Sequence, residues 1–156
     1  MKLHPMSGKE YNVWAPRSQA SYAADKMKAN RLTKAEAEKI AHDDFKQMLP
    51  DGLGSKDNFL FAAKDESQKI IGFIWFCVRG AEGNRRAFVC DVIVEENYRG
   101  KGFGKKIMLL AEKEAQSQGL RRIGLHVFGF NETAIHLYKS LGYTTTDLTM
   151  EKDLFS

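Results

Sequence analysis

This chain contains few of the features that define several classes of protein. It has two cysteines and three prolines in 156 residues, and no apolar run close to the roughly 18 residues that cross a membrane. The N-terminal segment MKLHPMSGKEY contains no apolar core of a secretion signal. These absences argue against a membrane-spanning or secreted protein, and a reducing cytoplasm is the simplest location to expect.

The two cysteines, Cys77 and Cys90, each lie inside an apolar run typical of a strand. Two isolated buried thiols make no disulfide framework and, without clustered histidines, they make no zinc site. An apolar setting also raises the pKa of a thiol, which argues against Cys90 as a nucleophile. We therefore expect no metal ion.

The overall composition is that of a globular protein. Hydrophobic residues make up 43% and charged residues 28% of the chain, which suits one domain spanning residues 1–156. The net charge is +4 and the isoelectric point about 9.0. Nucleic acid is not favoured as a partner, because no basic patch with interleaved stacking aromatics is visible.

The most informative stretch is Ala87–Lys106, AFVCDVIVEENYRGKGFGKK. An apolar run rich in β-branched residues predicts a buried strand, and a basic glycine-rich turn then opens a helix. The first N–H groups of a helix are unpaired, and glycines let a ligand approach the main chain closely. Together with the charges of Arg99, Lys101, Lys105 and Lys106, they predict a site for phosphate.

Three known phosphate-binding loops compete for this stretch. The P-loop requires Ser or Thr after its Gly-Lys pair, and here Lys106 follows Lys105. The dinucleotide loop requires G-x-G-x-x-G, whereas the glycines here are spaced G-x-G-x-G. The third pattern, [RQ]-x-x-G-x-[GA], fits Arg99–Gly104 at every fixed position. In this setting, the segment resembles the acyl-CoA pyrophosphate loop of the GNAT superfamily of N-acetyltransferases.

A second motif lies in Leu125–Tyr143, LHVFGFNETAIHLYKSLGY. It is similar to the GNAT pattern of a strand, an Asn, and then A-x-x-L-Y-x-x-x-G-[FY]. Two motifs at the expected separation are much more specific than either alone. The resemblance implies main-chain pairing of the pantetheine arm with Val92, Ile93 and Val94, a contact of that arm with Asn131, and Tyr138 beside the thioester sulfur. It also implies a pyrophosphate cradle formed by Arg99, Gly100, Lys101, Gly102, Phe103, Gly104 and Lys105.

The expected order of elements agrees with that family. The resemblance implies an α/β GNAT acyl-CoA N-acyltransferase fold, with a mixed, mostly antiparallel sheet, one parallel strand pair and flanking helices. We expect strands at Lys2–Met6, Asn58–Lys64, Lys69–Arg79, Ala87–Val94, Arg121–Phe128, Tyr143–Leu148 and Thr149–Leu154. We expect helices at Glu10–Trp14, at Arg17–Asn30 after a break or kink at Pro16, from the Thr33 cap to about Met48, at Phe103–Gln118 and at Glu132–Leu141.

The resemblance implies transfer of the acetyl group of acetyl-CoA to a small-molecule or peptide amine by direct attack. Tyr138, a phenol that is protonated at neutral pH, can donate a proton to the leaving thiolate. His126, Asp91 or a water chain can accept the proton of the amine. One branch of the family, the acetylases of peptide N-termini, carries a glutamate base at the position of His126. Main-chain N–H groups near Val92–Val94, where the family strand has a bulge, are expected to stabilise the oxyanion.

Other functions stay open at the level of sequence. An acyl-CoA binding or regulatory module would keep the cofactor loop without turnover, and a nucleic-acid-associated basic protein is a third reading. The acceptor cannot be identified, and a homodimer is left open. The acceptor site in this fold draws on the first two helices, which carry Tyr11, Trp14, Tyr22, Asp25, Asp43 and Asp44.

Overall fold

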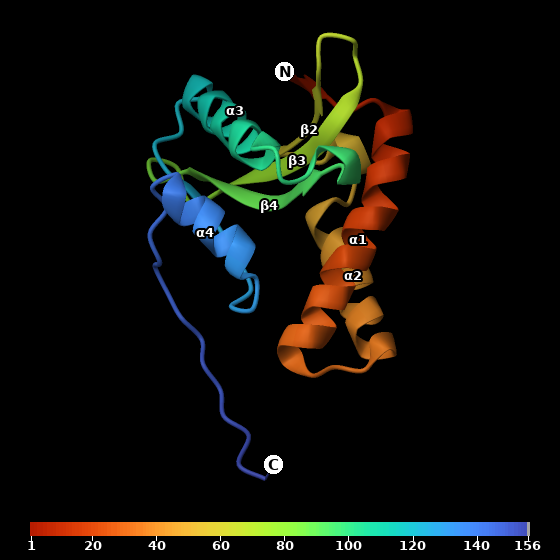
Figure 1. Cartoon of the computed structure of the whole chain (residues 1–156), viewed down its shortest axis with the longest axis vertical. Helices are drawn as coiled ribbons and strands as arrows, with labels where there is room; N and C mark the ends of the chain where they lie inside the picture. Colours follow the sequence, from red (N-terminus) through yellow and green to blue (C-terminus); the bar gives the residue numbers. More distant parts are fainter. Residues whose placement is uncertain (156) are drawn as a thin grey trace.

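The computed structural model describes residues 1–155 and contains one five-stranded sheet with helices on both faces (Figure 1). The strands follow the chain in the order β1-β2-β3-β4-β5. Every neighbouring pair is antiparallel except β4 and β5, which are parallel. The strands are β1 (Lys2–Pro5), β2 (Asn58–Lys64), β3 (Ile70–Arg79), β4 (Arg86–Val94) and β5 (Ile123–Leu125). The helices are α1 (Gly8–Asn30), α2 (Lys34–Met48), α3 (Phe103–Ser117) and α4 (Glu132–Ser140), with short 3-10 turns at Gly52–Gly54 and Glu96–Tyr98.

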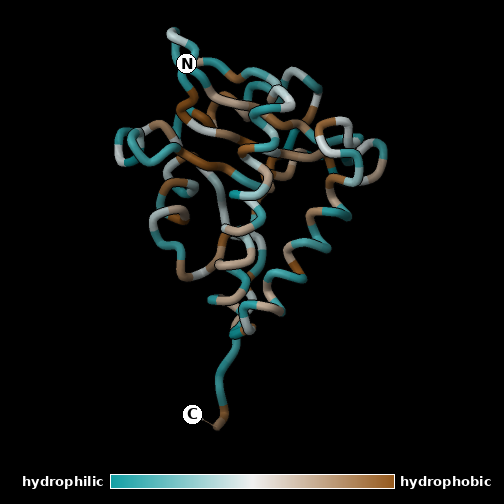
Figure 2. Tube along the Cα trace, turned by 90° about the vertical axis from the view of Figure 1, so that its right-hand side faces the viewer, coloured by the Kyte–Doolittle hydropathy of each residue, from teal (hydrophilic) through white to brown (hydrophobic). Residues whose placement is uncertain are grey.

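The central strands were predicted correctly because their apolar runs are buried on both faces. On one face, Phe61, Ile74 and Val89 pack against Ile107 and Met108 of α3. On the other face, Trp14 of α1 packs with Leu60 and Phe73. Figure 2 shows the hydrophobic stretches of the trace running through the sheet in the middle of the molecule. The predicted mixed sheet with one parallel pair is therefore confirmed.

The N-terminal helix differs from the prediction. Residues 8–30 form one helix, α1, rather than two helices separated at Pro16. A capping box between Ser7 and Glu10 starts the helix, and Pro16 lies on its exposed side. Proline inside a helix removes one main-chain hydrogen bond, but the packing of α1 on the sheet and of Ala23 against α2 keeps the segment helical. The predicted capping box of α2, between Thr33 and Glu36, is confirmed.

The C-terminal part of the chain also differs. β5 covers Ile123–Leu125 instead of Arg121–Phe128, and no strand forms between Tyr143 and residue 155. The hydroxyl of Tyr143 donates to Glu112 of α3 at 3.1 Å, and beyond this contact the chain leads away from the sheet (Figure 1). A segment of residues with high strand propensity forms a strand only where another strand supplies hydrogen-bond partners. The predicted strands at 143–148 and 149–154 are therefore wrong.

Candidate active site

β4 loses its partner on one side at the point where the predicted cofactor residues begin. β5 pairs with β4 over three residues, all before Cys90. The N–H of Glu95 bonds the carbonyl of Ile71 at 2.8 Å, and the direction of main-chain groups alternates along an antiparallel strand. The N–H and C=O groups of Val92 and Val94 therefore point away from β3, into the opening beyond the end of β5. Ile93 points its carbonyl toward Gly72 of β3 and is also among the residues that line the opening.

A β-bulge precedes this open segment. Phe76 pairs with Val89 and Trp75 pairs with Asp91, so that Cys90 is an extra residue in β4. Because Asp91 is paired with Trp75, its side chain lies on the α1 face of the sheet. The bulge lies at Cys90, just before Asp91 and Val92, near the segment Val92–Val94 where the family resemblance implied one. The bulge therefore directs the carboxylate of Asp91 toward α1.

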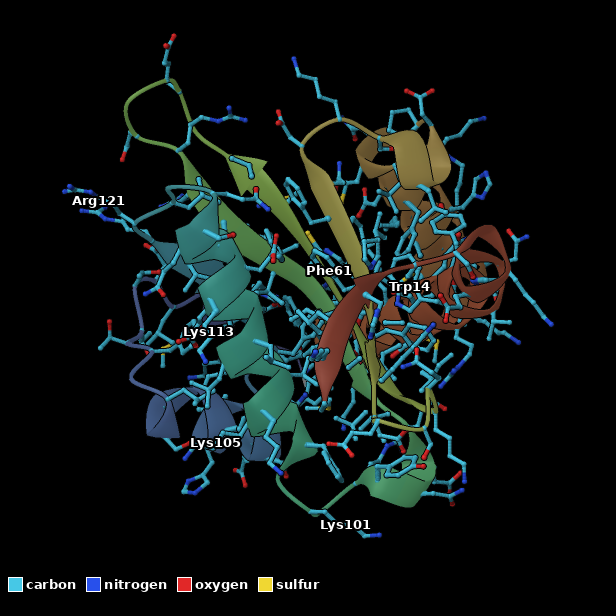
Figure 3. The ribbon with its side chains drawn as sticks, turned by 90° about the horizontal axis from the view of Figure 1, so that it is seen from above. Trp14, Phe61, Lys101, Lys105, Lys113 and Arg121 are labelled. Carbon is cyan, nitrogen blue, oxygen red and sulfur yellow. The ribbon has the colours of Figure 1, made fainter. Side chains whose placement is uncertain are left out.

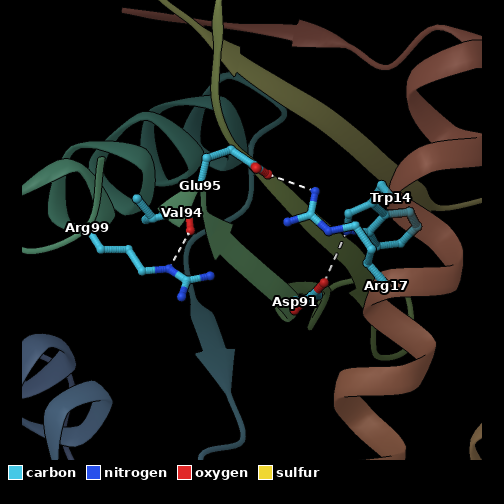
Figure 4. Close-up of polar contacts among 6 residues, drawn as sticks. All are labelled: Trp14, Arg17, Asp91, Val94, Glu95 and Arg99. Atoms are coloured by element: carbon cyan, nitrogen blue, oxygen red, sulfur yellow. Dashed lines mark hydrogen bonds and ion pairs between the residues drawn. The ribbon is translucent and has the colours of Figure 1, made fainter. Parts of the chain in front are cut away.

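Asp91 is held by two donors from α1. Its carboxylate accepts hydrogen bonds from the indole N–H of Trp14 at 3.1 Å and from the hydroxyl of Ser18 at 2.5 Å (Figure 4 draws the first). Burial raises the pKa of Asp91, and the hydrogen bonds from Ser18 and Trp14 offset part of that effect. The carboxylate therefore binds a proton more tightly than an ordinary aspartate, which is a property of a general base.

A pocket of about 370 Å³ opens between α1 and the end of β4. Its lining consists of Arg17, Ser21, Val92, Ile93, Val94 and Arg99. Arg17 forms an ion pair of 2.9 Å with Glu95, and the Nε of Arg99 donates to the carbonyl of Val94 at 2.9 Å (Figure 4). The guanidinium groups of Arg17 and Arg99 thus flank the open end of the strand. That of Arg99 already bonds the carbonyl of Val94, a main-chain acceptor that faces the opening.

The glycine-rich loop has the conformation that the phosphate hypothesis requires. Gly100 and Gly102 have φ of 73° and 83°, in the left-handed region, and a Cβ on either glycine would meet no atom within 4 Å. Gly102 is the N-cap of α3, so the first N–H groups of that helix face open space. Figure 3 shows Lys101 in the loop and Lys105 near the start of α3, both at this end of the helix. An anion can therefore approach the main chain with cations nearby.

Gly104 has a different role from the other two glycines. A Cβ on it would lie 3.4 Å from Leu137 of α4 and 3.7 Å from Val94 of β4. The first turn of α3 is therefore packed between α4 and β4, and Gly104 permits that approach. Phe103, also predicted in the cradle, packs edge-on against Tyr98 with ring centroids 5.7 Å apart.

The second motif places Asn131 and Tyr138 at the start and in the body of α4. The side chain of Asn131 caps the helix by accepting from the N–H of Ala134 at 3.2 Å. Tyr138 is half-buried and packs edge-on against Tyr143. Burial raises the pKa of Tyr138, and the negative charge of Asp91 raises it further. The phenol therefore keeps its proton at neutral pH.

His126 lies in a loop and not on β4 or α4, the elements that carry Asp91 and Tyr138. β5 ends at Leu125, so His126 begins the following loop, where it is exposed and packs edge-on against Phe128 at 4.9 Å. Of the two protein bases predicted, the structure puts Asp91 beside the pocket-lining residues and leaves His126 exposed in this loop.

Some residues at the site were not predicted. Trp14 was expected only as part of the acceptor region, and Arg17, Ser18 and Glu95 were not singled out. The sequence does contain a signal, because positions 14, 17, 18 and 21 share one face of a helix. Of the other acceptor candidates, Tyr22 donates to Asp44 at 2.8 Å, so both side chains are engaged in joining α1 to α2. Over residues 1–155, no group of three or more His, Cys, Asp or Glu side chains could hold a metal ion, and no helix is long and apolar enough to cross a membrane.

Comparison with known proteins places this geometry in a family. The profile described as "Acetyltransferase (GNAT) family" matches residues 22–143. The uncharacterized N-acetyltransferase YycN of Bacillus subtilis is 32% identical over 152 residues, which are 97% of each chain. Its crystal structure superposes with a TM-score of 0.93 and covers 99% of this chain and 98% of its own.

A more distant relative has a named substrate. The thialysine N-epsilon-acetyltransferase of Mus musculus is 30% identical over 127 residues, which are 74% of this chain and 74% of the mouse protein. A second protein of B. subtilis, the uncharacterized N-acetyltransferase YdgE, is 26% identical over 97% of both chains.

Proposed function

Because this chain belongs to the GNAT family of acetyltransferases, we propose that it transfers the acetyl group of acetyl-CoA to a primary amine by direct attack of the amine on the thioester. The observation that carries the proposal is the open end of β4. There, Asp91 lies on the α1 face of the strand and Tyr138 packs with the core on the α3 face. A candidate base and a candidate acid thus flank a strand end whose main-chain groups have no neighbouring strand beyond the end of β5, although the carbonyl of Val94 accepts from Arg99.

The residues present fit acetyl-CoA. The N–H and C=O groups of Val92 and Val94 would hold an extended amide-containing arm, as a neighbouring strand would. The loop from Arg99 to Lys105 would hold the pyrophosphate through main-chain N–H groups and nearby cations. Arg99 must release the carbonyl of Val94 if that carbonyl is to accept from the arm, and its guanidinium is then available for phosphate. Asn131 is assigned a contact with the arm in addition to its capping role.

When bound, acetyl-CoA supplies an acetyl thioester with a thiolate leaving group. We assign the role of base to Asp91, which accepts the proton of the incoming ammonium directly or through water, since an alkylammonium with a pKa of about 10 must first become neutral. We assign the role of acid to Tyr138, whose raised pKa keeps the proton available for the thiolate. Main-chain N–H groups in the segment Val92–Val94 would stabilise the negative charge that develops on the carbonyl oxygen.

His126 is the second candidate for the base. A neutral imidazole nitrogen can accept a proton from an amine. It is exposed to solvent in the loop after β5, where its ring packs against Phe128 rather than against the residues that line the pocket.

The acceptor is proposed to be a small primary amine or the amine of a peptide. The mouse relative is named for acetylating the ε-nitrogen of thialysine, so amino acids with side-chain amines are the first compounds to test. The decisive assay incubates the protein with acetyl-CoA and a panel of amines, measures thiol release, and identifies acetylated products by mass. Thiol release that depends on an amine supports the proposal. Tight acetyl-CoA binding without any acetylated product across small amines and peptides would contradict it.

We propose the cytoplasm as the site of action.

A further inference from the structure

Cys77 and Cys90 are not isolated from one another, contrary to the expectation from sequence. They come from the neighbouring strands β3 and β4, and their sulfur atoms lie 3.5 Å apart on the α1 face of the sheet. Both are free thiols. No other cysteine is present in the chain, so any disulfide within one molecule must join these two.

The surroundings favour a reactive thiolate at Cys77. The thiol of Cys90 donates toward the sulfur of Cys77, and the cationic side chain of Arg79 lies beside it. The hydrogen bond from Cys90 and then the guanidinium of Arg79 lower the pKa of Cys77, while burial opposes them. Hydrogen bonding to Cys77 raises the pKa of Cys90. The pair therefore brings a sulfur whose pKa is lowered into contact with a sulfur whose pKa is raised, the arrangement expected of a nucleophilic thiol and its resolving partner.

Cys90 is also the bulge residue directly before Asp91. Phe76 and Trp75 pair with the residues on either side of it, so Cys90 has no strand partner that fixes its position. The position of the Asp91 carboxylate depends on this bulge and on its bonds to Trp14 and Ser18. A covalent bond at Cys90 would thus shift the backbone of the bulge and, with it, the carboxylate of Asp91, the proposed base.

We propose that Cys77 and Cys90 form a reversible disulfide when the protein meets a peroxide, and that this disulfide slows acetyl transfer by shifting Asp91. The slowing of transfer depends on the proposed function, whereas formation of the disulfide does not.

The chemistry balances with hydrogen peroxide as the oxidant. The thiolate of Cys77 attacks one peroxide oxygen, the O–O bond breaks, and Cys77 becomes a sulfenic acid while hydroxide leaves and is protonated to water. The sulfur of Cys90 then attacks the sulfur of Cys77, the S–O bond breaks, and the thiol proton leaves with the hydroxyl group as a second water. Two thiols and one peroxide thus give one disulfide and two waters. A small dithiol reverses the reaction by exchange.

We expect formation of the bond to move the backbone near Asp91. The two sulfurs must approach from 3.5 Å to the length of an S–S bond, about 2.05 Å. Cys77 belongs to the central strand β3 and is paired on both sides, with Asn58 of β2 and Phe88 of β4, whereas Cys90 belongs to the bulge. Most of the movement therefore falls on Cys90, which is drawn toward β3 and carries Asp91 with it.

The test compares the wild-type protein with Cys90→Ser and Cys77→Ser, each treated with a small excess of hydrogen peroxide. Intact mass after alkylation under denaturing conditions counts the free thiols, and dimedone traps a sulfenic acid. In the wild type we expect both thiols to be lost together, the mass to fall by two hydrogen atoms, and the dithiol to restore both thiols. In Cys90→Ser we expect a dimedone adduct on Cys77 and no disulfide.

Acetyl transfer is measured on the same samples. Displacement of a catalytic group by about 1 Å can cost roughly a hundredfold in rate, so we expect a loss of up to that size, reversed by the dithiol. Cys77→Ser under peroxide should keep its untreated rate. Two thiols that stay free, or a disulfide only between molecules, would overturn the disulfide. An internal disulfide with an unchanged rate would overturn its effect on Asp91.

Discussion

Trp14 donates its indole N–H to the carboxylate of Asp91 at 3.1 Å, across 77 positions of the chain. The bond joins a fully buried ring of α1 to the strand that follows the bulge of β4. Ser18, one helical turn later, donates to the same oxygen. The position of the proposed base is therefore set by the packing of α1 on the sheet, and a mutation in α1 can alter catalysis without touching the substrate.

Replacing Asp91 with Asn tests the base. The amide keeps the shape and an oxygen acceptor for Trp14 and Ser18 but cannot accept a proton from the amine. We expect turnover to fall by roughly 10²–10⁴-fold, the usual contribution of a general base, with little change in acetyl-CoA affinity. The matched control is Asp43→Asn, because Asp43 is exposed on α2 and its ion pair is with Lys39 of the same helix. Wild-type kinetics in Asp91→Asn would transfer the role to His126 or to water.

The pH dependence of stability gives an independent check on Asp91. Burial raises its pKa in the folded protein above that in the unfolded chain, so the folded state binds the proton more tightly. The stability it contributes is full below the pKa of the unfolded chain and is lost as the pH rises through the raised folded value. Denaturant melts of Asp91→Asn should lack this decline. A decline that persists unchanged would show that another group causes it.

His126→Ala separates the two candidate bases. The side chain is exposed, and its ring contacts Phe128 in the loop after β5. We expect turnover within about threefold of the wild type and an unchanged activity–pH profile, since this ring does not take the proton in the proposed mechanism. Loss of the acidic inflection of that profile in His126→Ala, but not in Asp91→Asn, would reverse the assignment.

The parts of the fold that the sequence predicts well are those with local causes. The capping box at Thr33, the apolar run of β3 and the glycine at the start of α3 each determine their structure from neighbouring residues. The glycine-rich loop was predicted for the same reason, because a left-handed Gly102 before a helix follows from a short motif. These features need no knowledge of the rest of the chain.

The features that the sequence predicted wrongly depend on residues that are distant in the chain. Pro16 marks a helix break by local rules, yet the sheet and α2 hold α1 together. The threonine-rich segment after Tyr143 has strand propensity, but in residues 143–155 it pairs with no strand. The contact between Cys77 and Cys90 depends on a bulge whose position follows from the register of β3 against β4. Such register is not visible in a single sequence.

The phosphate loop can be tested with a pair of glycine variants at the two ends of α3. Gly102→Asp and Gly119→Asp both place a side chain at positive φ, 83° and 78°, and both positions have open space around the added Cβ. Their backbone cost should therefore be similar, at about 1–2 kcal/mol. Only Gly102→Asp puts a negative charge at the proposed pyrophosphate site. By calorimetry we expect acetyl-CoA binding to weaken strongly in Gly102→Asp and to stay near wild type in Gly119→Asp. Equal affinities of the two variants for acetyl-CoA would show that the loop does not bind the pyrophosphate.

A stability prediction concerns Gly72, which pairs with Val94 at the open end of β4. A Cβ on Gly72 would lie 2.2 Å from the carbonyl oxygen of Ile93 and 2.8 Å from the side chain of Ile107. Gly72→Ala should therefore lower the free energy of unfolding by about 1–3 kcal/mol or more, the range of overpacked cores. In the control Gly124→Ala in β5, the nearest atom is 3.9 Å away, and we expect a change below about 0.5 kcal/mol. Equal denaturation midpoints would show that the strands can separate to admit a methyl group.

Tyr138→Phe tests the proposed general acid and has a close control in its neighbour. The substitution keeps the ring and its packing in the core, so the fold should lose no more than about 1 kcal/mol, the scale of one net hydrogen bond. It removes the proton donor, and turnover should fall by roughly 10²–10⁴-fold if departure of the thiolate limits the rate. The control is Tyr143→Phe, whose ring lies 5.9 Å from that of Tyr138 and whose hydroxyl bonds Glu112.

In the control, the bond to Glu112 is lost, so a small decrease in melting temperature should accompany nearly normal turnover. A large loss of turnover in Tyr138→Phe alone, with acetyl-CoA affinity preserved, is the expected result. If both variants lose stability and cofactor binding together, Tyr138 is a packing residue. Normal turnover in a stable Tyr138→Phe would mean that the leaving thiolate takes its proton from water.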